Sequence, residues 1–164
     1  PEYATWVKKR ITETTDAEDI ILLGHSFGGR IASLIASERP VWLRGLILYG
    51  SPSLRRPPIR IKFKIKIAKI CKALGLRAKV IRPHSDLRLA DESGMGDILR
   101  KIIEFDMTKE LPLISAPTLL VWGKHDQPVP LRIAREMHSL ISGSKLIVME
   151  NEGHNALVEN EAND

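Results

Sequence analysis

A candidate nucleophile, Ser26, lies between two glycines in the stretch Gly24-His25-Ser26-Phe27-Gly28. The apolar run 20–23 precedes it, and a helical pattern over 27–38 follows at once. A strand that turns through G-x-S-x-G into a helix holds the serine at its carboxyl end, near helix N–H groups that stabilise negative charge. The spacing therefore predicts a nucleophilic serine, and the alternative is a turn serine that caps the helix.

The residues around such a turn must be small, because the incoming strand and the outgoing helix nearly touch. Three glycines of this sequence flank the serine, namely Gly24, Gly28 and Gly29. We expect them to supply the room that the turn requires.

A serine hydroxyl is a weak nucleophile until a base takes its proton, so partners are expected further along the chain. The stretch LLVWGKHDQPVP ends a predicted strand and brings Asp126 to its tip, and LIVMENEGHNALVE does the same for His154. Parallel neighbouring strands would bring both residues to the edge that presents Ser26. His154 would then accept and return the proton, and Asp126 would orient the imidazole. The alternatives are a loop-capping carboxylate and a surface histidine.

The remaining histidines fit this chemistry less well. His25 adjoins the serine and is expected to fill structural space, and His125 precedes the acid, against the expected order of acid and then base. His84 and His138 have the character of surface residues. No pair of histidines has metal-ligand spacing, and Cys71 is the single cysteine, so we expect neither a metal nor another cofactor.

The hydrophobic pattern predicts strands that alternate with helices. Helical spacing covers 3–14, 27–38 and 129–142, and the short apolar runs 20–23, 45–50, 116–123 and 144–150 are predicted strands. This order predicts an α/β fold with a parallel sheet. The run 20–23 shows no alternation, which predicts a strand that is buried on both faces.

Residues 51–112 interrupt this rhythm and are interpreted as an insertion that lies over the top edge of the sheet. Isoleucines and basic residues alternate over 59–67, which fits an extended stretch, although a helical face also fits from Phe63 onward. A mainly helical insertion is expected because Ile98, Ile102 and Phe105 recur at helical spacing. The predicted domains are thus a core of 1–50 and 113–164 and an insertion of 51–112.

The net charge of +5 is concentrated in this insertion. Segment 55–82 holds eleven Lys or Arg and no Asp or Glu, and without it 14 basic residues face 20 acidic ones. The body is therefore not a polycation built for nucleic acid. The basic segment could be a solvent-exposed face, a surface that binds an anionic membrane or a binding site for an acidic substrate.

The expected compartment is the cytoplasm. A lone cysteine excludes an internal disulfide and fits a reducing environment. No apolar run reaches the length of a membrane span, and the opening PEYATWVKKR lacks the apolar segment of a signal peptide.

The stretches GHSFGGR, PTLLVWGKHDQPVP and NEGHNALVEN, in this order and each after a strand, resemble the α/β-hydrolase superfamily. The resemblance is to serine hydrolases that carry a cap, including esterases and C–C bond hydrolases. It implies Ser26 as nucleophile, Asp126 as acid, His154 as base and 51–112 as the cap, acting on a small-molecule substrate without a cofactor.

The same resemblance implies parts that this sequence does not contain. Family members have strands before the elbow and a loop there that donates an N–H to the oxyanion hole, so only the Phe27 N–H can be assigned to that hole here. The expectation is therefore an N-terminally incomplete copy, either a fragment or one piece of a split protein, with the elbow strand at an exposed edge. The functional alternatives are an ester or thioester hydrolase, a C–C hydrolase of diketones, and an inactive remnant or module that binds an anionic surface.

Overall fold

The computed structural model describes residues 2–16, 18–56 and 105–155. Residue contacts group Pro1–Leu54 with Asp106–Asp164 in one unit and Arg55–Phe105 in another, and every described helix and strand belongs to the first unit. The patterns at 59–67 and 98–105 and nearly all of the basic segment 55–82 lie outside the described residues. The cap, its boundaries and its anionic partner therefore stay predictions.

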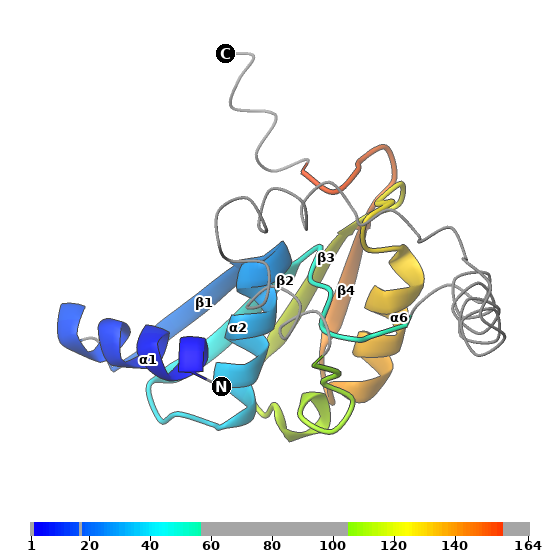
Figure 1. Cartoon of the computed structure of the whole chain (residues 1–164). Helices are drawn as coiled ribbons and strands as arrows, with labels where there is room; N and C mark the ends of the chain where they lie inside the picture. Colours follow the sequence, from blue (N-terminus) through cyan, green and yellow to red (C-terminus); the bar gives the residue numbers. More distant parts are fainter. Residues whose placement is uncertain (1, 17, 57–104, 156–164) are drawn as a thin grey trace, which may run out of the picture. The chain divides into compact units, whose positions relative to one another are not determined.

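Four parallel strands form a single sheet in the order β1-β2-β3-β4 (Figure 1). They are β1 (Ile20–His25), β2 (Leu43–Tyr49), β3 (Thr118–Gly123) and β4 (Lys145–Met149). Each neighbouring pair runs in the same direction. The predicted parallel α/β fold is confirmed, and the strand ends differ from the predicted ones by only a few residues.

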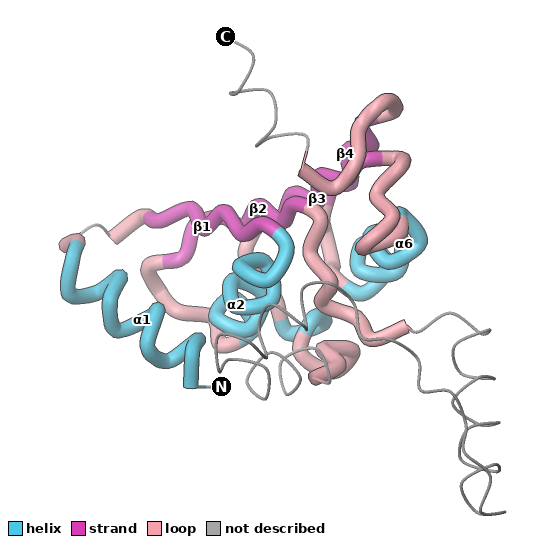
Figure 2. Tube along the Cα trace, turned by 45° about the horizontal axis from the view of Figure 1, so that its top comes forward, coloured by secondary structure: helices cyan, strands magenta, loops and turns pink. Residues whose placement is uncertain are grey.

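The described helices lie on one side of this sheet, as Figure 2 shows. They are α1 (Glu2–Thr14), α2 (Ser26–Ser37), α6 (Leu131–Leu140) and the short 3₁₀ helix η1 (Leu111–Leu113). Apolar residues at helical spacing turn towards the core, such as Ile133, Ala134 and Met137 of α6. The three longer helices match the predicted ones, whereas η1 is too short to leave a periodic signal.

The core lies between these helices and the covered face of the sheet. Leu46 and Leu48 of β2 and Leu120 and Trp122 of β3 are at most 1% exposed there. The indole N–H of Trp122 donates to the Val129 carbonyl at 2.7 Å, so this buried polar group is satisfied. Helix and sheet thus meet through large apolar side chains that alternate along each strand.

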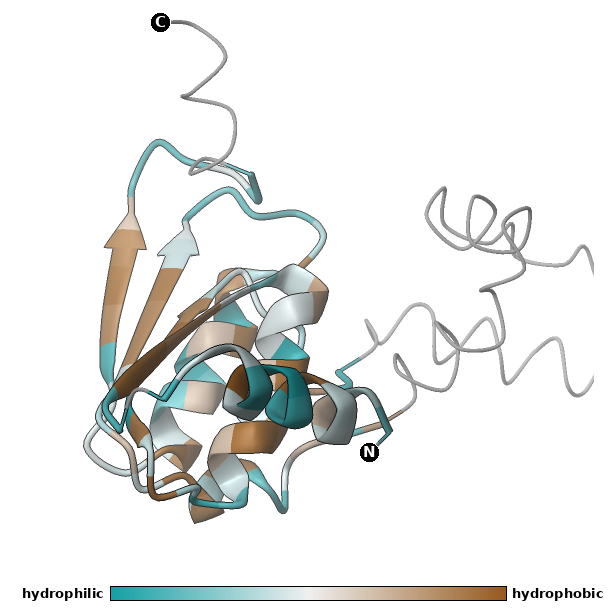
Figure 3. Cartoon of the chain, turned by 90° about the vertical axis from the view of Figure 1, so that its left-hand side faces the viewer, coloured by the Kyte–Doolittle hydropathy of each residue, from teal (hydrophilic) through white to brown (hydrophobic). Residues whose placement is uncertain are grey.

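No described helix covers the opposite face of the sheet, as Figure 3 shows. Leu23 of β1 is 63% exposed, and it pairs with Ile47, which in turn pairs with Leu119 on the same face. The prediction that 20–23 is buried on both faces is wrong, because Ile21 and Leu23 point to this uncovered side. Among the described strands β1 is also an edge strand, as expected.

The chain leaves and re-enters the first unit at adjacent points. The Met107 N–H donates to the Ser53 carbonyl at 3.1 Å, and Leu54 and Met107 are both buried. The segment between them therefore begins and ends at one place on the core.

Two leucine truncations test the difference between the two faces. Leu120→Ala is expected to lower the free energy of unfolding by about 2–5 kcal/mol, because it opens a cavity where the side chain is fully buried. Leu23→Ala removes the same atoms from an exposed site and should change it by less than about 0.5 kcal/mol. Denaturant unfolding of both variants measures the difference, and equal losses would mean that the second face is covered in the folded protein.

Candidate active site

Ser26 occupies a strained turn between β1 and α2. Its φ is 48°, in the left-handed region that side chains disfavour. A Cβ added to Gly24 would lie 2.5 Å from the Gly29 Cα, and one added to Gly29 would lie 2.5 Å from the Ser51 Oγ. The predicted need for small residues is thus met at Gly24 and Gly29. It does not apply to Gly28, where an added Cβ meets nothing within 4 Å.

The three residues predicted from separate loops come together at one edge of the sheet. The His154 Nε2 lies 3.1 Å from the Ser26 Oγ, and the His154 Nδ1 lies 2.7 Å from the Asp126 Oδ2. Each residue follows the carboxyl end of a strand: β1, β3 and β4 for Ser26, Asp126 and His154. The parallel direction of the strands therefore brings a hydroxyl, an imidazole and a carboxylate into a hydrogen-bonded row.

The hydrogen-bond partners determine which nitrogen of His154 carries the proton. An ionised carboxylate only accepts hydrogen bonds, so the Nδ1–H must be the donor to Asp126. In the neutral ring the Nε2 then has a free lone pair, which accepts the Ser26 O–H. This tautomer is the one that can take a proton from the serine.

Asp126 is held from two directions and shielded from water. Its side chain is 1% exposed, and its Oδ1 accepts the Val129 N–H at 2.7 Å while its Oδ2 faces the imidazole. The loop-capping role considered as an alternative is thus present together with the contact to His154. A buried carboxylate fixed in this way can orient the imidazole and stabilise its positive form.

The loops that carry the acid and the histidine are joined by backbone hydrogen bonds. The Lys124 N–H donates to the Met149 carbonyl at 2.9 Å, and the His125 N–H donates to the Glu152 carbonyl at 3.0 Å. A bond from Lys124 to Glu150 at 2.5 Å lowers the pKa of that carboxyl. Because the carboxyl pKa is lowered, this ion pair stabilises the fold fully when the pH is above the usual pKa of a glutamate. The stabilisation is lost as the pH falls through the lowered pKa. Glu150 is fully exposed, so salt screens this contribution.

A buried polar network supports the turn from behind. Ser53 lies 3.3 Å from Ser33 of α2 and 2.9 Å from Ser51, oxygen to oxygen. Arg30 donates to the Pro52 carbonyl. Burial lowers the pKa of its guanidinium, and the charge of Asp106 opposes this shift. The network connects the middle of α2 to the loop after β2.

The Phe27 N–H, assigned to an oxyanion hole, lies at the start of α2. Phe27 is the second residue of this helix, and the first N–H groups of a helix have no partner within it. Its ring packs edge-on against Tyr3 of α1, with centroids 6.3 Å apart. The role of this N–H stays a prediction.

Sequence reasoning missed Gly50, which lies against His154 and Asp126, and Tyr49, which contacts the loop that carries His154. Gly50 has φ +50°, and a Cβ there would lie 3.0 Å from the His154 Nδ1 and 3.2 Å from the Asp126 Oδ2. The Tyr49 hydroxyl donates to the Gly153 carbonyl at 3.4 Å. The signal was the glycine that ends the strand predicted at 45–50, at the same edge of the sheet.

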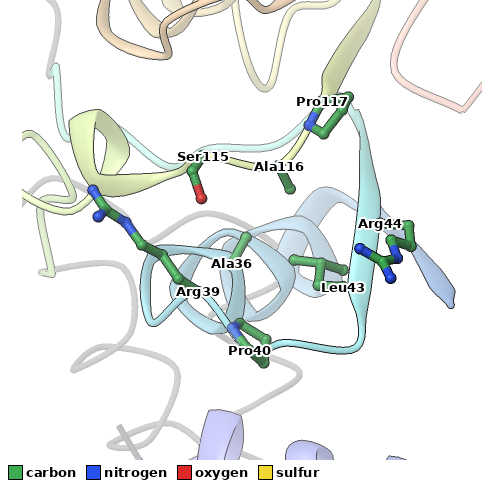
Figure 4. A pocket seen from close by; sticks show the side chains of 8 residues that line it. All are labelled: Ala36, Arg39, Pro40, Leu43, Arg44, Ser115, Ala116 and Pro117. Atoms are coloured by element: carbon green, nitrogen blue, oxygen red, sulfur yellow. The ribbon is translucent and has the colours of Figure 1, made fainter. Parts of the chain in front are cut away.

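A cleft of ≈ 320 Å³ lies at the other end of the strands (Figure 4). Arg39 and Arg44 line it, and both already have partners within the chain. The Arg39 Nε donates a hydrogen bond to the Leu113 carbonyl at 2.7 Å, and the Arg44 Nε donates one to the Asp19 carboxylate. The lining residues of the cleft lie just before β2 and β3 or at their first residues, which is the amino end of these strands. Ser26, Asp126 and His154 lie at the carboxyl ends, so the cleft is not part of the candidate site.

Residues 2–16, 18–56 and 105–155 contain no group of three or more His, Cys, Asp or Glu side chains that could hold a metal ion. Within the same ranges, no helix is both long and apolar enough to cross a membrane.

Comparison with known proteins identifies relatives of this arrangement. The family model described as alpha/beta hydrolase fold matches residues 62–161, more than half of the chain. A proline iminopeptidase of Saccharolobus solfataricus is 29% identical over 181 residues, which cover 87% of this chain and 58% of that protein. A 2-hydroxy-6-oxononadienedioate/2-hydroxy-6-oxononatrienedioate hydrolase of Cupriavidus pinatubonensis is 25% identical over 173 residues, which cover 90% of this chain and 60% of that protein.

The fold of this chain is also similar to that of a solved esterase structure. The esterase EaEST from Exiguobacterium antarcticum matches with a TM-score of 0.69 and 25% identity, over 97% of this chain and 68% of that chain. The chain spans less than two thirds of the length of the two curated relatives.

An alanine at position 50 tests how closely the backbone must approach the site. Gly50→Ala should lower the free energy of unfolding by about 1–3 kcal/mol, because a positive φ disfavours a side chain and the new Cβ would press on His154. It should also shift or abolish the low-field proton NMR resonance of the His154 Nδ1–H. The matched control is Gly28→Ala, which enters open space within a helix and should preserve both the resonance and the stability. An unchanged resonance in Gly50→Ala would contradict this account of the contact.

Proposed function

Because this chain belongs to the α/β-hydrolase fold family, we propose that it is part of a serine hydrolase that uses Ser26, His154 and Asp126 as its catalytic triad. The observation that carries the proposal is the pair of hydrogen bonds made by His154, at 3.1 Å to the serine and 2.7 Å to the aspartate. The strained φ of Ser26 supports it further, since unfavourable backbone geometry of this kind gathers at functional sites.

The proposed reaction proceeds through an acyl-enzyme. The Ser26 oxygen attacks the substrate carbonyl carbon while the His154 Nε2 takes the hydroxyl proton. The Phe27 N–H is the assigned donor to the resulting oxyanion. The leaving group departs with the proton from His154, and a water molecule, activated by the same imidazole, then releases the acyl group and regenerates Ser26.

An ester or thioester is the proposed substrate, and a diketone cleaved at a C–C bond is the second candidate. The first is supported by the similarity to the esterase EaEST, and the second by the similarity to the Cupriavidus hydrolase, whose name describes an oxo-dienedioate substrate. The same three side chains serve both reactions, so the choice depends on the pocket around them.

Labelling with a fluorophosphonate probe tests the proposed triad. The chain should react at one site, and Ser26→Ala should abolish labelling because it removes the attacking oxygen. Asp126→Asn should slow labelling by a factor on the order of 10³–10⁴, since an amide cannot hold His154 in the tautomer that accepts the proton. Active-site mapping by mass spectrometry and labelling kinetics are the measurements. A folded sample that the probe does not modify would instead indicate an inactive remnant.

Substrate turnover separates the two reaction classes. Short-chain p-nitrophenyl esters should be hydrolysed in a reaction that Ser26→Ala eliminates, whereas a dienoate diketone should not be cleaved faster than in buffer. Absorbance assays follow both reactions with the same enzyme sample. Cleavage of the diketone at a higher kcat/KM than any ester would favour the C–C hydrolase.

A further inference from the structure

His25, the residue before Ser26, contacts the backbone of His154, which takes no part in the proposed mechanism. The His25 Nε2 lies 3.1 Å from the His154 backbone carbonyl, and the two imidazole rings lie 5.1 Å apart. These residues are 129 positions apart in the sequence, so the contact exists only in the fold.

The strand geometry explains why His25 reaches this carbonyl. Successive side chains of a strand point to opposite faces, so His25 points away from the face where Gly24 contacts α2. The sheet register pairs His25 with Tyr49, and the two rings stack with centroids 5.0 Å apart. Both side chains lie at the carboxyl end of the sheet, where the loop that carries His154 passes.

Two successive carbonyls of this loop accept hydrogen bonds from these rings. His25 contacts the carbonyl of His154, and the Tyr49 hydroxyl donates to the carbonyl of Gly153. A carbonyl oxygen only accepts, so the His25 Nε2 must carry a proton and donate it. His25 therefore adopts the tautomer opposite to that of His154, whose proton is on Nδ1.

We propose that His25 is a positioning residue, which donates from its Nε2 to the His154 carbonyl and so holds the imidazole in line between Ser26 and Asp126. The inference rests on the proposed function and deepens it. The bond to Asp126 restrains the far side of the ring, and the close approach of Gly50 restrains the ring itself. The backbone of His154 is restrained by His25 and Tyr49, and without that restraint the Nε2 would leave the line of the Ser26 hydroxyl.

Nitrogen-15 NMR of the histidines tests the geometry without any need for activity. At mildly alkaline pH, where imidazoles are neutral, the His25 signals should show a protonated Nε2 and the His154 signals a protonated Nδ1. Histidine-to-glutamine variants at each position assign the signals. A His25 ring with its proton on Nδ1 and a free Nε2 could not donate to the carbonyl, and this result would overturn the proposal.

Two substitutions at position 25 test the consequence for reactivity. Gln places an amide nitrogen the same number of bonds from Cα as the histidine Nε2, so His25→Gln retains the donor, whereas His25→Leu keeps similar bulk without one. Fluorophosphonate labelling should slow by about 10–100-fold in His25→Leu and by less than about threefold in His25→Gln. Tyr49→Phe, which keeps the ring and removes the hydroxyl that donates to the Gly153 carbonyl, should slow labelling by a smaller factor than His25→Leu does.

The comparison between these variants distinguishes positioning from simple packing. If His25 only fills space, Leu and Gln will slow labelling equally, or Leu will be the milder change, and either result overturns the proposal. Thermal unfolding of each variant establishes that the labelled samples are folded. If the unsubstituted chain is not labelled at all, the proposed function fails, and the NMR experiment still decides whether His25 donates to the loop.

Discussion

The common direction of the four strands is the constraint on which the site depends. Because β1, β2, β3 and β4 are all parallel, the residues that follow their carboxyl ends gather at one edge of the sheet. Ser26, Gly50, Asp126 and His154 each follow a different strand, and they meet there although the serine and the histidine are 128 positions apart. Reversal of any one strand would move its residue to the far end, where the cleft beside Arg39 and Arg44 lies.

The site also depends on how closely backbone segments approach each other behind it. Gly24 and Gly29 let β1 and α2 touch, and Gly29 in turn admits the hydroxyl of Ser51. That hydroxyl belongs to the buried serine network, which continues to Ser33 and Ser53. The strained conformation of Ser26 is therefore maintained by packing and hydrogen bonds that involve no reacting atom.

The fold class and the element types could be predicted from hydrophobic patterning, because short apolar runs and helical periodicity report burial directly. The same patterning gave a wrong prediction for β1, which was expected to be buried on both faces, whereas Ile21 and Leu23 are exposed. The run 20–23 is apolar at every position, and such a run fits a strand between two layers, yet only one side of it is covered by described helices. A local hydrophobic pattern indicates which residues favour burial, but it does not identify the segment that packs against them.

For the candidate site, the sequence by itself determined the residue types and their order: a serine between glycines after an apolar run, then an acid and a histidine, each after another such run. These are properties of short segments, so they can be recognised one at a time. Only the tertiary structure decided that Gly50 lies against the imidazole and that His25 reaches the carbonyl of His154. Such contacts arise from the register between strands and from the path of a distant loop, and neither is encoded in the residues adjacent to the contact.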